Sequence, residues 1–116
     1  MARRKTKSGD CYEAAAKYML ERSLAGDSDL VLVHGEVQGQ GPLAGQTFGH
    51  AWVEDDYSVV DCSGGRFTRM LRSEYYAIGR IDALNNLHRY NWNEACSRLL
   101  ATKVYGPWDL QTASGL

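Results

Sequence analysis

The sequence predicts an α+β fold, in which an N-terminal helix packs on a small antiparallel β-sheet and C-terminal helices cover the sheet's other face or edge. Three observations indicate this class: a helical repeat of apolar residues near the start, β-branched runs in the middle, and two helical patterns near the end. The 116 residues suit one domain, which we expect to span 1–116 with a flexible basic tail at 1–8.

The first helix is expected over residues 9 to about 24, where apolar residues recur at helical spacing and charged residues occupy the opposite side. Asp10 is a good N-cap residue, so Cys11 falls in the first turn. A thiol at that position lies near the positive end of the helix dipole, which favours the thiolate form. The sulfur of Cys11 is therefore a candidate nucleophile.

Three strands are expected to follow as an antiparallel meander. Residues 30–37 are rich in β-branched side chains, and the glycine-rich stretch 38–46 after them predicts a loop. Residues 47–54 and 57–62 then form a hairpin, provided that the two aspartates between them make a two-residue turn.

The second half of the chain is expected to cover the sheet. Residues 68 to about 78 and 92 to about 102 have helical patterns, and Asn91 is a suitable N-cap for the second helix. The segment 104–110 is irregular but aromatic, so we expect it to pack on the body of the domain. The sequence suggests no function for residues 64–116.

Composition excludes several classes of function. Charged residues make up 23% of the chain, the formal net charge is −1, and the only basic cluster is the short run at 2–7, which argues against a nucleic-acid partner. No stretch approaches the roughly 20 apolar residues of a membrane span, and no signal-peptide core is present, so we expect a cytoplasmic protein without a membrane partner. Three cysteines without a C-x-x-C pair argue against a disulfide framework, and we expect no cofactor or metal. The oligomeric state stays open.

Cys11, His50 and Asp61 form the candidate catalytic site. With a two-residue turn, Glu54 pairs with Tyr57, and counting back along both strands sets His50 directly opposite Asp61. Opposed residues lie about 4.5–5.5 Å apart, so the carboxylate reaches one imidazole nitrogen and leaves the other for the thiol. This arrangement corresponds to the nucleophile, general base and orienting carboxylate of a catalytic triad.

Three segments carry a resemblance to a known family. Gly9-Asp10-Cys11 before an alanine-rich helix, the His-Ala-Trp run within residues 49–54, and Val-Val-Asp at 59–61 resemble, in this order, the transglutaminase-like branch of the papain-like cysteine hydrolases. The resemblance covers residues 9 to about 63. It implies a papain/transglutaminase-like core and a thiol protease or related hydrolase with a protein or peptide substrate. It also implies that Cys11 is the nucleophile, His50 the base and Asp61 the orienting residue.

The chain departs from the family pattern around the nucleophile. No Gln occurs in the ten residues before Cys11, where papain supplies an oxyanion-hole side chain, and Tyr12 stands where many members have Trp or Arg. The backbone N–H of Cys11 is the first candidate oxyanion donor, and Gln46 or a backbone group of the glycine-rich loop is the second. Trp52 is either a core residue or a wall of the substrate groove, and His34 is a further candidate for substrate contact.

Several alternatives stay open beside hydrolysis of an amide, peptide or isopeptide bond through a thioester. The fold could serve without turnover as a protein-binding module or inhibitor, or the reaction could be deamidation or transglutaminase-type acyl transfer. A zinc site made of Cys11, His50, Asp61 and Cys62 is disfavoured, because adjacent strand residues point to opposite faces. We expect Cys62 and Cys96 to pack in the core.

Overall fold

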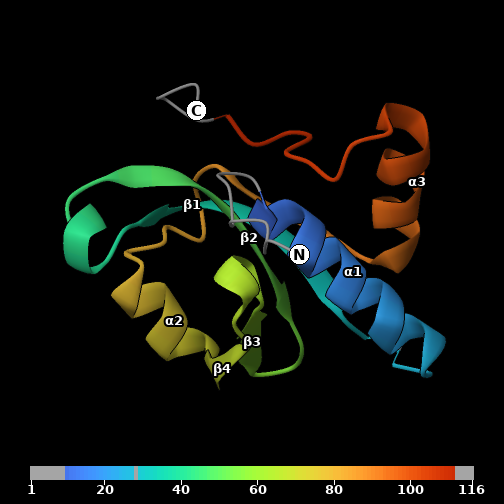
Figure 1. Cartoon of the computed structure of the whole chain (residues 1–116), viewed down its shortest axis with the longest axis horizontal. Helices are drawn as coiled ribbons and strands as arrows, with labels where there is room; N and C mark the ends of the chain where they lie inside the picture. The colour runs from blue at the N-terminus through green and yellow to red at the C-terminus, as the bar shows by residue number, and fades with distance from the viewer. Residues whose placement is uncertain (1–9, 28, 112–116) are drawn as a thin grey trace, which may run out of the picture.

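The computed structural model describes residues 10–27 and 29–111, and the predicted basic tail at 1–8 lies outside these ranges. Within them, one five-stranded antiparallel sheet and three α-helices confirm the α+β class (Figure 1). The elements are α1 (Asp10–Leu24), β1 (Val31–Gln38), β2 (Thr47–Glu54), β3 (Ser58–Asp61), β4 (Thr68–Leu71), α2 (Arg72–Ile78), β5 (Leu87–Tyr90) and α3 (Trp92–Thr102). None of these helices combines the length and apolar character needed to cross a membrane, as judged over the described residues.

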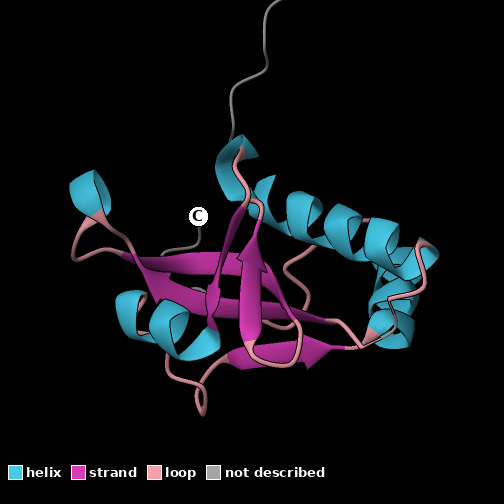
Figure 2. Ribbon diagram, turned by 90° about the horizontal axis from the view of Figure 1, so that it is seen from below, coloured by secondary structure: helices cyan, strands magenta, loops and turns pink. Residues whose placement is uncertain are grey.

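The two faces of the sheet bury different apolar clusters, because successive strand residues alternate between faces. Leu32 belongs to a cluster with Met19 of α1 and Ala95 of α3, so these two helices share one face (Figure 2). Val33, the next residue along β1, belongs to a second cluster around Trp52, on which α2 packs. The C-terminal helices were expected on the sheet's other face or edge. α2 covers the other face, whereas α3 lies on the same face as α1 and packs against β1 and the edge strand β5.

The sheet has five strands rather than the expected three, in the order β4-β3-β2-β1-β5. The stretch 68–78 is not one helix, since its first four residues form β4 and pair antiparallel with β3. Residues Leu87–Tyr90, for which no element was predicted, pair with β1 as β5. Both edge strands are short and are defined by hydrogen bonds to a neighbouring strand, which the local pattern of residues does not reveal.

The turn between β2 and β3 is longer than predicted, which changes the register of the hairpin. Glu54 pairs with Val59 and not with Tyr57. The Asp55 backbone N–H donates to the Ser58 carbonyl at 3.1 Å, and an Asp55 carboxylate oxygen accepts from the Ser58 N–H at 3.0 Å. This aspartate turn lengthens the connection, so the register moves by two residues and every side chain keeps its face.

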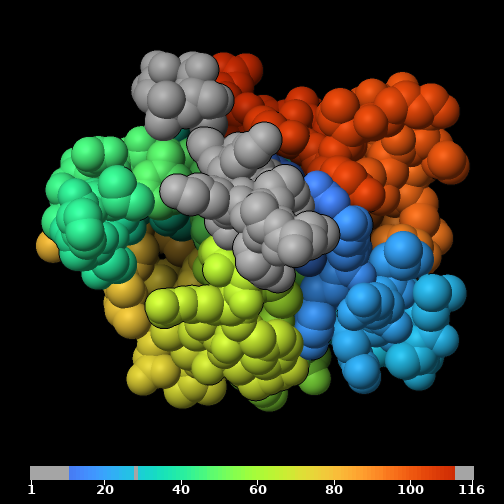
Figure 3. All heavy atoms as spheres, viewed as in Figure 1, coloured from blue at the N-terminus to red at the C-terminus, as the bar shows by residue number. Residues whose placement is uncertain are grey.

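The C-terminal segment 104–110 packs on the body of the domain, as expected. Leu110 is buried in the cluster that contains α1 and α3. The rings of Trp108 and Tyr90 lie 5.0 Å apart in an edge-to-face arrangement. In Figure 3 this segment, in red, lies along the blue α1 and the orange α3.

Candidate active site

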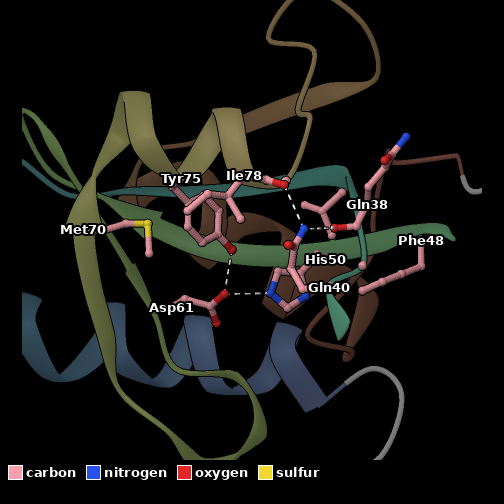
Figure 4. Close-up of a pocket in the computed structure, with 11 residues that line it drawn as sticks. Gln38, Gln40, Phe48, His50, Asp61, Met70, Tyr75 and Ile78 are labelled. Atoms are coloured by element: carbon pink, nitrogen blue, oxygen red, sulfur yellow. Dashed lines mark hydrogen bonds and ion pairs between the residues drawn. The ribbon is translucent and has the colours of Figure 1, made fainter. Parts of the chain in front are cut away.

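His50 of β2 and Asp61 at the end of β3 meet through a hydrogen bond (Figure 4). His50 Nε2 lies 2.9 Å from Asp61 Oδ2, and the two side chains are only 13% and 14% exposed. The bond was predicted, but its geometry differs from the prediction, because the observed register offsets the two residues instead of setting them directly opposite. Since the offset is two residues, both side chains remain on one face and within diagonal reach.

Cys11 lies in the first turn of α1 and is buried, with 8% of its surface exposed. β3 pairs with β2 only at Val53 and Glu54, so β3 does not pair with β2 at His50. α1 packs on β2 through the apolar cluster that holds Cys11, Ala51 and Val53. The Cys11 thiol lies close enough to the His50 imidazole to act on it electrostatically, since Cys11 helps to raise the pKa of His50. Because Asp61 occupies Nε2, the nitrogen left for the thiol is Nδ1. The structure thus brings the three predicted catalytic residues together in the predicted order.

Besides His50, two donors hold the Asp61 carboxylate in place. The Ser63 backbone N–H donates to Oδ1 at 2.9 Å, and the Tyr75 hydroxyl donates to Oδ2 at 2.6 Å, the same oxygen that faces His50. Tyr75 belongs to α2, and its ring packs 5.3 Å from that of Trp52. The sequence did not single out Tyr75 or Ser63, because their contacts depend on how α2 and the chain after β3 cross the sheet.

The site is strongly polarised. Burial alone lowers the pKa of His50, but hydrogen bonds and charge interactions with Asp61 and Cys11 outweigh burial and raise that pKa to about 9. Burial raises the pKa of Asp61, yet His50, and after it the Ser63 and Tyr75 donors, hold the pKa of this carboxyl well below its usual range. At neutral pH the pair is therefore an imidazolium beside a carboxylate.

A cavity of about 190 Å³ lies beside the His50–Asp61 pair (Figure 4). Its lining residues are Val37, Gln38, Gly39, Gln40, Phe48, His50, Asp61, Met70, Tyr75, Ile78 and Gly79. The Gln40 side-chain amide donates to the Ile78 carbonyl at 2.8 Å and so ties the loop after β1 to the end of α2. Cys11 is not among the lining residues, so the cavity borders His50 and Asp61 but not the nucleophile.

Gln46 and Trp52, two of the predicted substrate-site candidates, do not line this cavity. Gln46 is exposed, and its backbone carbonyl accepts from the Gly39 N–H at 2.8 Å. Trp52 is completely buried, and its indole N–H donates to Glu54 Oε2 at 2.9 Å. Of the two roles considered for Trp52, the structure supports the core role, beneath the rings that surround the site.

His34 lies on the opposite face of the sheet and does not line the cavity. It is completely buried, with ring centroids 4.9, 5.1 and 5.0 Å from those of Tyr12, Tyr90 and Trp108. Neither ring nitrogen has a hydrogen-bond partner among the described residues. Burial, followed by the charge of His88, lowers the pKa of His34 to about 4, so the ring is neutral at neutral pH.

The other two cysteines are half-buried. Burial raises the pKa of Cys62, with Asp61 adding to the effect, and burial also raises the pKa of Cys96 in α3. Within the described part of the chain, no group of three or more His, Cys, Asp or Glu side chains is placed to hold a metal ion.

A thiol at a helix N-terminus, an imidazolium and a fixed carboxylate are the groups used in nucleophilic acyl transfer. Comparison of the chain with protein-family models, curated proteins and solved structures gave no match in any of the three searches.

Proposed function

We propose that this protein is a cysteine hydrolase that cleaves an amide, peptide or isopeptide bond. The observation that carries the proposal is the hydrogen bond between His50 and Asp61, with Cys11 in the first turn of α1 near enough to raise the pKa of His50. Ser63 and Tyr75 hold the Asp61 carboxylate, so the imidazole is kept in one orientation. A helix-borne Cys with strand-borne His and Asp in an α+β fold also supports a papain/transglutaminase-like core, which we propose as the fold family.

The reaction would begin from the Cys11 thiolate and the His50 imidazolium. The thiolate attacks the carbonyl carbon, a C–S bond forms, and the carbonyl π electrons move to oxygen. When the oxyanion collapses, the C–N bond breaks and His50 Nδ1 gives its proton to the departing amine. Water, deprotonated by His50, then attacks the thioester carbonyl, the C–S bond breaks, and the thiolate and imidazolium are restored. Asp61 keeps the imidazole oriented and stabilises its charge.

The cavity beside His50 suggests where part of the substrate binds. Phe48, Met70 and Ile78 supply apolar walls, while the polar groups of His50 and Asp61 are already engaged with each other. An apolar cavity of roughly 150 Å³ is known to accommodate benzene. We therefore expect this cavity to accept one uncharged aromatic or branched aliphatic group close to the scissile carbonyl.

Selective alkylation tests the reactive pair directly. With limiting iodoacetamide at about pH 6, Cys11 should be labelled first, because it lies at a helix N-terminus near the His50 imidazole, whereas burial raises the pKa of Cys62 and of Cys96. His50→Gln should abolish this preference, as read by mass-spectrometric peptide mapping. His88→Gln, the same substitution on β5, is the matched control and should leave the labelling unchanged. Equal labelling of all three cysteines, or no effect of His50→Gln, would overturn the ion-pair hypothesis.

Turnover is tested separately with p-nitrophenyl acetate as an acyl donor. The wild-type protein should form an acetyl thioester on Cys11, visible in the intact mass, and release p-nitrophenol over many turnovers. Cys11→Ala should do neither while remaining folded, with a loss of stability of about 1–2 kcal/mol, because Cys11 is a small buried side chain in the apolar cluster that contains α1. A selectively reactive Cys11 without turnover of this ester or of a peptide library would favour the binding-module alternative.

A further inference from the structure

Tyr75 and His50 share one acceptor atom. The Tyr75 hydroxyl donates to Asp61 Oδ2 at 2.6 Å, and His50 Nε2 lies 2.9 Å from the same oxygen. The other carboxylate oxygen is occupied by the Ser63 N–H. Figure 4 shows the phenol on the α2 side of the carboxylate, at the wall of the cavity.

The Tyr75 hydroxyl is a permanent donor in this position. Burial and the neighbouring Asp61 carboxylate raise the pKa of Tyr75 far above its usual value, so the phenol stays protonated. An ionised Asp61 has no proton to donate, so the bond runs from tyrosine to aspartate. Asp61 and Cys11 both raise the pKa of His50. Cys11 and Tyr76, in addition to Asp61, raise the pKa of Tyr75.

We propose that Tyr75 is a positioning residue of this site that acts through Asp61, drawing charge from the carboxylate and so limiting how much of its negative charge reaches His50. The proposal rests on the Cys11–His50–Asp61 site proposed above. A strong donor on the shared oxygen competes with the imidazolium for the same electron density. Tyr75 would thereby keep His50 oriented while still allowing it to release its proton to the leaving group.

The sign of one measurement separates this role from a structural one. If Tyr75 draws charge from Asp61, then removing its hydroxyl strengthens the remaining bond from His50, and the pKa of His50 rises. If the hydroxyl merely holds the carboxylate in place, its removal loosens the His50–Asp61 bond and the pKa of His50 falls toward its ordinary value. The two roles predict shifts in opposite directions.

The experiment is an NMR titration of the His50 imidazole in wild-type protein and in Tyr75→Phe, which keeps the ring that packs on Trp52. We expect the pKa of His50 to rise by roughly half a unit to one unit, the size of the net contribution of one ordinary hydrogen bond. Tyr76→Phe is the matched control, because that hydroxyl belongs to the same helix but donates to Glu54. It should leave the titration of His50 unchanged.

A second comparison tests whether Tyr75 acts through Asp61. In an Asp61→Asn background, Tyr75→Phe should no longer move the titration of His50, because the shared acceptor has lost its charge. A downward or absent shift in the single variant, an equal shift in Tyr76→Phe, or a full shift in the Asp61→Asn background would overturn the proposal. None of these titrations requires catalytic turnover. A protein without hydrolase activity would therefore refute the proposed function, while the role of Tyr75 could still be tested.

Discussion

The substitution Asp61→Asn removes the charge that holds the proton on His50, and its cost can be worked from the structure. An unfolded histidine has a pKa near 6.5, whereas the pKa of His50 in the folded chain is about 9. The difference of roughly 2.5 units corresponds to about 3 kcal/mol of folding free energy. Because the folded state keeps the proton longer, this stabilisation is complete below about pH 6.5 and is lost as the pH rises through 9.

The assay is urea unfolding followed by tryptophan fluorescence, at about pH 6 and about pH 10. At each pH the free energy of unfolding of Asp61→Asn is subtracted from that of the wild type, so that titrations common to both proteins cancel. The two resulting differences are then compared. This difference should be larger by about 2–3 kcal/mol at the lower pH. Part of the rise in the pKa of His50 comes from Cys11, which Asp61→Asn leaves in place. The expected difference is therefore smaller than the full value of about 3 kcal/mol.

Asp55→Asn is the matched control for this experiment. Asp55 also accepts a backbone N–H and pairs with a cation, Arg69 at 2.9 Å, but the pair is exposed at the surface. Exposed ion pairs contribute about 0–1 kcal/mol, so the control should show no comparable change between the two pH values. A change below about 1 kcal/mol for Asp61→Asn, or an equal change for Asp55→Asn, would refute the assigned role of the His50–Asp61 pair.

Two further predictions concern the His34 side of the sheet. Burial lowers the pKa of His34 to about 4, so the unfolded chain binds this proton at a higher pH than the folded chain does, and the contribution of His34 to stability should fall by about 2 kcal/mol between pH 7 and 4.5. His34→Gln should largely lose this dependence in urea unfolding, and an unchanged dependence would contradict it. Gly106→Ala should cost about 2 kcal/mol or more, because φ is +133° and a Cβ would lie 2.7 Å from His34 Cε1. Gly26→Ala is the control, because Gly26 has a φ of +99° but open space around it, and it should lose less stability than Gly106→Ala. Equal losses of stability in the two variants would show that the contact with His34 is not the cause.

Elements with local signals were predicted well. The strand Thr47–Glu54 and the helix Trp92–Thr102 have the predicted bounds, and the expected cap of the helix is present as a capping box between Asn91 and Glu94. These elements depend on side-chain periodicity and on contacts within a few residues, which are visible in a single sequence. The first helix likewise ends at the predicted residue.

The edge strands were missed for a physical reason. Thr68–Leu71 and Leu87–Tyr90 are four residues each and have no strong alternation, so the helical pattern of 68–78 prevailed in the prediction. Their strand conformation comes from hydrogen bonds to β3 and β1, which are distant in sequence. The aspartate turn at Asp55 was also missed, since a two-residue and a longer turn share the same residue types.

The sequence by itself determined which residues form the candidate site and which face they share. Cys11 opens a helix, and His50 and Asp61 have the same parity along the hairpin, so an error of two residues in the register did not separate them. Tertiary structure alone decided the surroundings of that site. Tyr75 reaches Asp61 only because α2 packs on the Trp52 face, and His34 is removed from the cavity because β1 turns it to the other face. Periodicity along the chain specifies faces, whereas contacts across the sheet depend on packing between segments distant in sequence.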